Sequence, residues 1–430
     1  MLMDESKDTQ TEIKKSIEPA TEKAKQPGIR QPKKKLVATA VILVAILLIA
    51  GVIALISQKD ESTTTYNDQQ NSSQANNSSS PNENPWLADC EGDEKVMMSR
   101  MPMDLKDVQS ITPIGLTAGA HVTPIDHLYF YPTDMTNRDA APVYAMADGF
   151  VVDISKREIN VDSGTERPPE YRIAMQHSCQ TVSYFDLMTS LSDKLMQQFE
   201  EGSSLRIPIT AGEEVGRVGA QSLDTAVYNF SMTLPGFISP EKYAGEFWKV
   251  HTDDFFSYFE GEDRTAMLAK NIRKAEPLSG KIDYDQPGKL IGNWFREGTD
   301  YSGNGSGLIS QDGKRGYWSG HLAIFYFVAD PSIIVVSLGE YGDGSPQAFA
   351  VKGNAPDPAT IDSSSGIVAY ELVQQPTYTP EGRLNTGSQH VMGTVLFQVM
   401  DGEKLKVEAS PGKTKTQATT FTDNAQIYER

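Results

Sequence analysis

The sequence has little cysteine, little histidine and few basic side chains for its length. Its 430 residues include two cysteines and six histidines, which excludes a disulfide-rich scaffold and an array of several zinc sites. The 39 Lys and Arg residues are outnumbered by 57 Asp and Glu residues, and the net charge is −18. Because an acidic chain repels polyphosphate, we expect no nucleic-acid partner.

The common catalytic and phosphate-binding motifs are also absent. The sequence contains no Gly-x-Ser-x-Gly turn, no Walker phosphate loop, no Gly-x-Gly-x-x-Gly and no His-Glu-x-x-His. Each of these motifs would place a nucleophile, a phosphate-binding backbone or a pair of zinc ligands at a fixed position. Motifs of this kind therefore assign the chain to no enzyme class.

One long apolar run does occur, at residues 36–56. It carries no charge and one polar side chain, and at about 1.5 Å per residue it would extend about 30 Å, the thickness of a hydrocarbon core. A cleaved signal peptide has a shorter apolar core. Lys33, Lys34 and Lys35 directly precede the run, so the positive-inside rule places the N-terminus in the cytoplasm and residues 58–430 outside. We predict a single-pass helix in contact with membrane lipid, with a buried core helix as the weaker alternative.

The segments on either side of this run lack the composition of a folded domain. Residues 1–35 hold nine basic and six acidic side chains, which leaves a net charge of −21 on the rest of the chain. They contain too few large apolar residues to offset the chain entropy lost on folding, so we predict a disordered cytoplasmic tail. Residues 57–85 are rich in Ser and Asn, which predicts a flexible stalk outside the membrane.

From Trp86 onward the sequence predicts a mainly β fold, because short alternating or β-branched runs are separated by Gly, Pro, Asp and Asn. Residues 86–235 are expected to form one β domain, with a helix over residues 187–201, where apolar residues recur every four positions. Residues 236–278 are expected to be a helical and loop-rich connection. The expected strands of the first domain are 128–131, 142–145, 149–154, 171–177, 181–185 and 214–218.

Residues 279–430 are expected to form a second β domain, a small antiparallel barrel or sandwich. Asp401-Gly402 is a strong signal for a two-residue hairpin turn, in which both positions need a positive φ. The hairpin over residues 393–408 could add its strands to either β domain. The expected strands are 323–328, 333–338, 349–351, 367–372, 391–399 and 405–409.

Four segments within residues 115–230 carry a family likeness. They are Gly-Ala-His at 119–121 followed by Asp126, then PVYAMADGFVV at 142–152, YFDL at 184–187 and ITAGEEVGRVG at 209–219. In this order they resemble the lysostaphin/LytM-type zinc metallopeptidase domain, the duplicated hybrid motif fold of cell-wall endopeptidases and their inactive relatives. The resemblance implies a β domain in a cell-envelope protein.

The resemblance also implies a zinc ion held by two histidines and an aspartate, with an open position for a water molecule. In this sequence the pattern is incomplete. His121 and Asp126 are separated by four residues instead of three, and on a strand such a slip turns a side chain to the opposite face. The late strand at 226–232 lacks the family's His-x-His pair, and Asp186 stands where the middle strand would carry a histidine. We therefore predict a degenerate member with no catalytic residue and no metal.

An active zinc site remains the alternative, built from His121, Asp126, His177 and Asp186. No spacing in the sequence specifies such a set. Two protein side chains alone rarely retain a zinc ion. We expect His121 and His127 to be surface or hydrogen-bonded histidines at a strand end. His177 is expected to be a strand histidine with its hydrogen bonds satisfied.

The two cysteines present a second alternative. Cys179 follows Gln-His-Ser at 176–178, which would suit a cysteine nucleophile beside a histidine. Cys90 also lies outside the predicted membrane span, where paired cysteines normally oxidise. We predict a Cys90–Cys179 disulfide, which would close a loop of about 90 residues and contribute up to about 4 to 5 kcal/mol in the chain-entropy model.

Three functions of different class follow from these features. The favoured one is a membrane-anchored extracytoplasmic protein, not an enzyme, whose peptidase-like domain binds cell-wall glycan or peptide, or an envelope protein partner. The second is a divergent zinc metallopeptidase acting on cell-wall or surface peptides. The third is a surface or assembly component whose β domains only make protein contacts. Metal content separates the second function from the others.

Overall fold

The structure is a computed structural model, and it describes residues 84–87, 95–157, 168–200, 206–303, 315–379 and 383–430. These residues all belong to one compact unit. The predicted tail and membrane span, and the stalk up to residue 83, lie outside the described residues. In the described part of the chain no helix is both long and apolar enough to cross a membrane, so the anchor at residues 36–56 stays a prediction.

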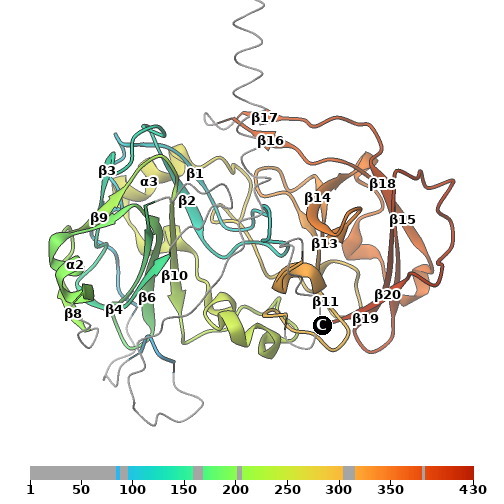
Figure 1. Cartoon of the computed structure of the whole chain (residues 1–430), viewed down its shortest axis with the longest axis horizontal. Helices are drawn as coiled ribbons and strands as arrows, with labels where there is room; N and C mark the ends of the chain where they lie inside the picture. Colours follow the sequence, from blue (N-terminus) through green and yellow to red (C-terminus); the bar gives the residue numbers. More distant parts are fainter. Residues whose placement is uncertain (1–83, 88–94, 158–167, 201–205, 304–314, 380–382) are drawn as a thin grey trace, which may run out of the picture. The chain divides into compact units, whose positions relative to one another are not determined.

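A seven-stranded antiparallel sheet forms the first β region, drawn in cyan and green in Figure 1. Its order is β1-β2-β10-β6-β5-β4-β8, so strands that are distant in the sequence, such as β2 and β10, pair directly. A three-stranded sheet, β3-β9-β7, and the helix α2 accompany it. The bounds are β1 Val108–Thr112, β2 Leu128–Pro132, β3 Ala141–Tyr144, β4 Gly149–Arg157, β5 Glu170–Gln176, β6 Thr181–Met188, β7 Ser190–Leu191, α2 Asp193–Glu200, β8 Ile207–Ile209, β9 Glu214–Val218 and β10 Leu223–Asn229.

The alternation of side chains along β10 decides which groups reach each face of this sheet. Leu223 and Val227 belong to the main hydrophobic core on one face. Because successive strand residues point to opposite faces, Asp224, Ala226 and Tyr228 lie on the other face. We call this other face the polar face of the sheet.

The connection between the two β regions consists of short helices that pack into the first core. Phe255, Phe256 and Met267 of this segment are buried in the same cluster as the inner face of the sheet. The side chain of Asp254 caps η3 by accepting a hydrogen bond from the Phe256 amide at 3.0 Å. The bounds are η1 Pro240–Glu246, η2 Lys249–His251, η3 Phe255–Tyr258 and α3 Gly261–Lys270.

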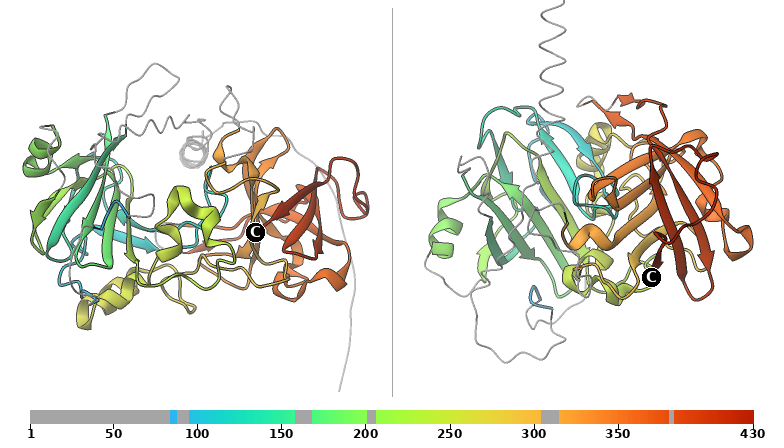
Figure 2. Two further views of the ribbon diagram at one scale, coloured as in Figure 1. Left: turned by 90° about the horizontal axis from the view of Figure 1, so that it is seen from below. Right: turned by 45° about the vertical axis from the view of Figure 1, so that its right-hand side comes forward.

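The second β region is a closed antiparallel barrel of eight strands, drawn in orange and red in Figure 2. Its interior holds a cluster of apolar side chains that includes Trp294, Phe349 and Phe397, as expected for eight strands, whose barrel is just wide enough to be filled by side chains. The strands are β11 Gly292–Arg296, β12 His321–Tyr326, β13 Ile334–Tyr341, β14 Ser345–Val351, β15 Val368–Gln374, β18 Gly393–Met400, β19 Lys404–Pro411 and β20 Gln426–Glu429. The remaining elements are η4 Tyr317–Gly320, η5 Lys352–Asn354, η6 Pro358–Thr360, η7 Ser363–Ser365 and the pair β16 Thr377–Tyr378 and β17 Leu384–Asn385.

Most predicted strands are confirmed, and the hairpin at residues 393–408 adds its strands to the barrel. Its turn differs in detail from the prediction. Met400 pairs with Lys404, so the loop has three residues, and the positive φ angles fall on Gly402 and Glu403. The predicted start of the helix at residue 187 is wrong, because β6 continues to Met188 and α2 begins at Asp193.

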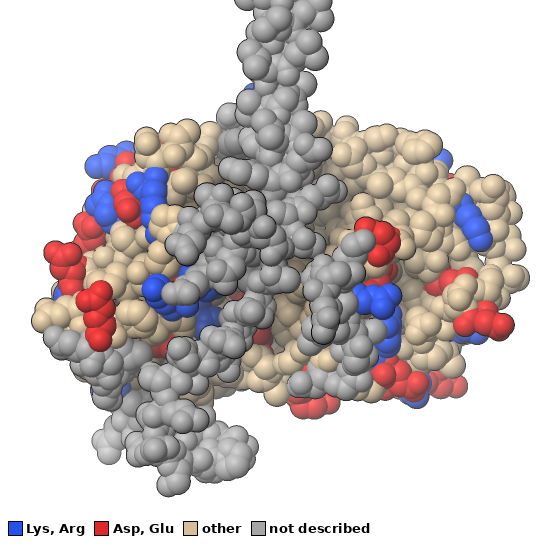
Figure 3. Space-filling view, viewed as in Figure 1, with Lys and Arg blue, Asp and Glu red and all other residues tan. Residues whose placement is uncertain are grey.

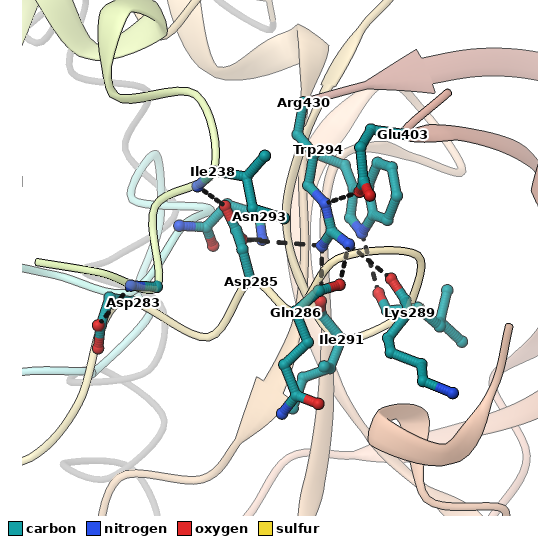
Figure 4. Close-up of polar contacts among 12 residues, drawn as sticks. Ile238, Asp283, Asp285, Gln286, Lys289, Ile291, Asn293, Trp294, Glu403 and Arg430 are labelled. Atoms are coloured by element: carbon teal, nitrogen blue, oxygen red, sulfur yellow. Dashed lines mark hydrogen bonds and ion pairs between the residues drawn. The ribbon is translucent and has the colours of Figure 1, made fainter. Parts of the chain in front are cut away.

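Arg430 and Asp285 lie where the barrel meets the connection, as Figure 4 shows. The Arg430 guanidinium donates to the Ile291 carbonyl at 2.7 Å and to Glu403 Oε2 at 2.8 Å, and it lies 4.0 Å from the centroid of the Trp294 ring. Nearby, Asp285 accepts hydrogen bonds from the amides of Ile238 and Asn293. Because Ile238 lies two residues before η1, this carboxylate fixes where the connection begins.

Candidate functional site

Asp126 lies on the loop that leads into β2, and only 4% of it is exposed. Its carboxylate is surrounded by donors and cations from three parts of the chain. The Tyr228 hydroxyl on β10 donates to Oδ2 at 3.0 Å. Oδ1 lies 3.5 Å from Nδ1 of His127 and 3.8 Å from Nζ of Lys249. The charge of Asp126 is therefore compensated inside the protein.

His127 joins two carboxylates. While its Nδ1 faces Asp126, its Nε2 lies 3.3 Å from Oδ2 of Asp224 on β10. Burial alone would lower the pKa of His127, but the charge of Asp224 and the interaction with Asp126 outweigh burial and raise the pKa to about 9. The imidazole is therefore protonated at neutral pH and bridges the two acids as a cation.

Lys249, the first residue of η2, brings the second cation, and only 1% of it is exposed. Its ammonium donates to the Pro124 carbonyl at 2.7 Å and lies 5.3 Å from the centroid of the Tyr301 ring. Burial tends to raise the pKa of Asp126, but Lys249 and His127 hold that pKa well below its usual range. We call Asp126, His127, Asp224, Tyr228 and Lys249 together the Asp126 network.

A third buried carboxylate, that of Asp186, lies on the same polar face. The register of β6 and β10 places Asp186 directly opposite Asp224, and two like charges in that position repel each other. Asp186 has partners of its own: it pairs with Arg157, and it accepts hydrogen bonds from the Tyr184 hydroxyl at 2.6 Å and the Leu187 amide at 2.7 Å. Each of the two aspartates thus has its own cation.

This arrangement supports electrostatic neutralisation better than proton transfer. His127 already carries its proton at neutral pH and so cannot act as a general base there. Burial raises the pKa of the Tyr228 hydroxyl well above its ordinary value, and Asp126 keeps its negative charge. In the Asp126 network two carboxylates balance two cations, which is the arrangement that makes burying such charges tolerable.

The four residues of the alternative zinc site have different surroundings in the structure. His121 lies beside the Asp126 network, with its ring centroid 6.1 Å from that of His127, and burial followed by the charges of His127 and Lys249 lowers its pKa to about 3. His177 instead contacts the Asp148 carbonyl at 2.9 Å and Ser183 Oγ at 2.6 Å, so its hydrogen bonds are satisfied as predicted. Asp186 binds Arg157. Throughout the described ranges, no three His, Cys, Asp or Glu side chains form a group that could hold a metal ion.

His127 is buried and ion-paired next to the start of β2, so of the two predicted forms it takes that of a hydrogen-bonded histidine at a strand end. One expectation about this region needs correction. The segment from His121 to Asp126 is a loop, since the His121 amide donates to the Ala118 carbonyl in a tight turn. The argument that a one-residue slip on a strand reverses His121 therefore does not apply.

Sequence reasoning missed Asp224, Tyr228 and Lys249. The spacing of Asp224 and Tyr228 was a usable signal once this segment is taken as a strand, because residues four positions apart on a strand lie on one face. Lys249 had no such signal. It stands in a connection with no motif, and its contact with Pro124 spans 125 positions of the sequence.

Cys179 lies in the turn between β5 and β6 and is half-buried. No free cysteine occurs among the described residues, and no disulfide joins two of them. The predicted partner, Cys90, lies outside the described residues. The Cys90–Cys179 disulfide therefore stays a prediction.

An aromatic cluster adjoins the Asp126 network on the polar face. Trp86 is 5% exposed and packs against Tyr228, Phe247 and Trp248, with ring centroids 5.9, 5.3 and 4.8 Å away. Burying 150 to 250 Å² of a tryptophan contributes about 4 to 6 kcal/mol. Ordering residues 84–87 costs about 1 to 2 kcal/mol per residue. The free energy gained by burying Trp86 is thus similar in size to the entropy cost of ordering residues 84–87.

Neither a protein-family model nor a curated protein matches the chain. Twelve solved chains match it, and one of them is the NMR solution structure of lysostaphin. That structure is 10% identical with a TM-score of 0.19, and the match covers 62% of this chain and 88% of the lysostaphin chain. A match at this TM-score supports no conclusion about the fold or the site.

Replacing Lys249 by methionine is expected to destabilise the protein by about 3 to 5 kcal/mol, because Asp126 is left buried without its nearest ammonium. Lys194→Met is the matched control, since it breaks a pair with Glu213 whose side chains are 44% and 26% exposed. That change should cost less than about 1 kcal/mol. Chemical denaturation of both variants measures the difference. Equal losses would show that Lys249 does not neutralise a buried charge.

The raised pKa of His127 predicts a specific pH dependence. A histidine whose pKa rises from about 6.5 in the unfolded chain to about 9 in the folded chain contributes about 3 kcal/mol. This contribution is complete below pH 6.5 and is lost as the pH rises through 9. Between pH 6 and pH 10 the free energy of unfolding should therefore fall by about that much more in the wild type than in His127→Gln. If the free energy of unfolding changes with pH in the same way in both proteins, His127 does not form these ion pairs with Asp126 and Asp224.

Proposed function

We propose that this protein is a membrane-anchored extracytoplasmic protein whose peptidase-like domain has lost catalysis and binds cell-wall glycan or peptide, or an envelope protein. The apolar run at residues 36–56 with its basic flank supports the anchor and an N-terminus in the cytoplasm. The lysostaphin/LytM-like segments within residues 115–230 support the family assignment. The observation that carries the loss of catalysis is the Asp126 network.

The network opposes a catalytic zinc ion in two ways. A histidine must be neutral to ligate a metal. His121 meets that condition, but the neighbouring His127 is held protonated between Asp126 and Asp224 and would repel a metal cation there. The carboxylate of Asp126 also already faces the Lys249 ammonium at 3.8 Å. A divalent cation at this position would have to displace one buried cation and deprotonate another. Without that metal, the hydrolytic water of this family has no Lewis acid to lower its pKa.

The charge of the exposed surface supports an uncharged ligand over a polyanion. In the face shown in Figure 3, acidic and basic side chains are interspersed among uncharged areas of the described residues. The net charge of −21 outside residues 1–35 repels long anionic polymers. Neutral glycan, wall peptide or a protein surface remains the suitable class of partner.

The proposal is tested on the full-length protein by zinc analysis, a wall-peptide hydrolysis assay and co-sedimentation with isolated cell-wall material. We expect well under one zinc per chain, no cleavage, and co-sedimentation that His121→Ala leaves unchanged. Stoichiometric zinc that is lost in His121→Ala, together with cleavage, would establish the metallopeptidase instead. Absence of both cleavage and any wall or envelope partner would favour a passive assembly component.

A further inference from the structure

Residues 84–87 span the end of the predicted stalk and the start of the first β domain, and their one buried side chain is that of Trp86. Pro85 is exposed, and Asn84 and Leu87 are half-buried. The indole of Trp86 stacks on that of Trp248 with 25° between the ring planes. Tyr228, Phe247 and Trp248 together surround it, and we call these three residues the aromatic cup.

The attachment of this segment depends on the Trp86 side chain. Within the described part of the chain, its backbone amides find their partners locally: the Trp86 amide donates to Asn84 Oδ1 at 2.9 Å, and the Leu87 amide donates to the Asn84 carbonyl at 3.1 Å. Meanwhile β10, beside the segment, keeps its own pairing with β2 and β6. Residues 84–87 can therefore leave without breaking a strand ladder.

The aromatic cup is built by the folded body and does not depend on Trp86. Tyr228 is fixed on β10 by its hydrogen bond to Asp126. Phe247 and Trp248 connect η1 to η2 and are held by Lys249, which is bonded to Pro124. Phe247 also packs edge-on against Trp248, with centroids 5.1 Å apart. Departure of Trp86 would thus uncover a preformed aromatic surface on the polar face.

We propose that residues 84–87 are a strap whose Trp86 fills, within the same chain, a binding site for an aromatic side chain of a protein partner. The strap blocks the aromatic cup while it is docked and opens the cup when it leaves. The inference rests on the proposed function, because it specifies how the degenerate face takes up an envelope protein. A peptide partner is favoured over a glycan because the observed occupant is an indole stacked face to face on another indole.

The strap predicts that removing Trp86 creates a site for the same sequence supplied as a separate molecule. The probe is a peptide with the sequence of residues 82–88 (NENPWLA), titrated against full-length protein by saturation-transfer NMR, which detects weak binding. We expect Trp86→Ala to bind this peptide at least tenfold more tightly than the wild type, in which the docked strap competes. Pro85→Ala, which changes the exposed residue of the segment, is the matched control and should behave as the wild type, and a peptide with alanine for tryptophan should bind none of the three proteins.

Equal peptide binding by the wild type and Trp86→Ala, or none by folded Trp86→Ala, would overturn the strap. Binding of an N-acetylglucosamine oligomer with the same dependence on Trp86, in place of the peptide, would overturn the protein partner. Co-sedimentation with cell wall but no peptide binding would remove the strap and leave the proposed function standing. Peptide binding by Trp86→Ala without any wall or envelope partner would support the strap and contradict the proposed function.

Hydrogen exchange on the wild type keeps the inference testable if Trp86→Ala does not fold. The amides of Trp86 and Leu87 should exchange at least a hundredfold faster than that of Tyr228, because the strap opens locally while β10 stays paired. Equal protection of these amides would show that residues 84–87 open only with the whole domain, and would refute the strap.

Discussion

The charge of the buried Asp126 carboxylate is the constraint on which the arrangement of the polar face depends. An isolated carboxylate in this position would be costly, so it requires cations and donors at close range. His127 comes from the adjacent position in the chain, Tyr228 from β10 and Lys249 from η2. The connection between the two β regions must therefore fold against the sheet, and a segment that would otherwise be a linker becomes part of the site.

Two further buried carboxylates are likewise paired with cations. Asp186 is paired with Arg157, and Asp285 lies 3.9 Å from the buried guanidinium of Arg430. Burial raises the pKa of Asp285 to about 6, while Arg430 and the amides of Asn293 and Ile238 act in the opposite direction. Pairs of this kind fix geometry more than they add stability, and here they position η1 and η2. That positioning in turn builds the aromatic cup from Phe247 and Trp248.

The sequence predicted the strands well where burial imposes alternation, and it predicted the site poorly. β9 matches its prediction residue for residue, and the barrel follows from the second series of short strands. The helix start failed because the four-residue spacing that includes Leu187 also fits the end of β6, where Leu187 has φ of +59°. Lys249 could not be predicted, because no local pattern records that an ammonium more than a hundred positions away will neutralise Asp126. A comparison of motifs shows which zinc ligands the sequence lacks. Only the structure shows which side chains surround Asp126 in their absence.

His127 is a protonated bridge between Asp126 and Asp224, so a metal ion at Asp126 would have to deprotonate or displace a buried cation. NMR of ¹⁵N-labelled histidines, assigned by comparison with His127→Gln, measures the protonation of both ring nitrogens directly. Both nitrogens of His127 should be protonated at pH 7, and the imidazole should lose its proton near pH 9. A His127 that is neutral at pH 7 would contradict the account.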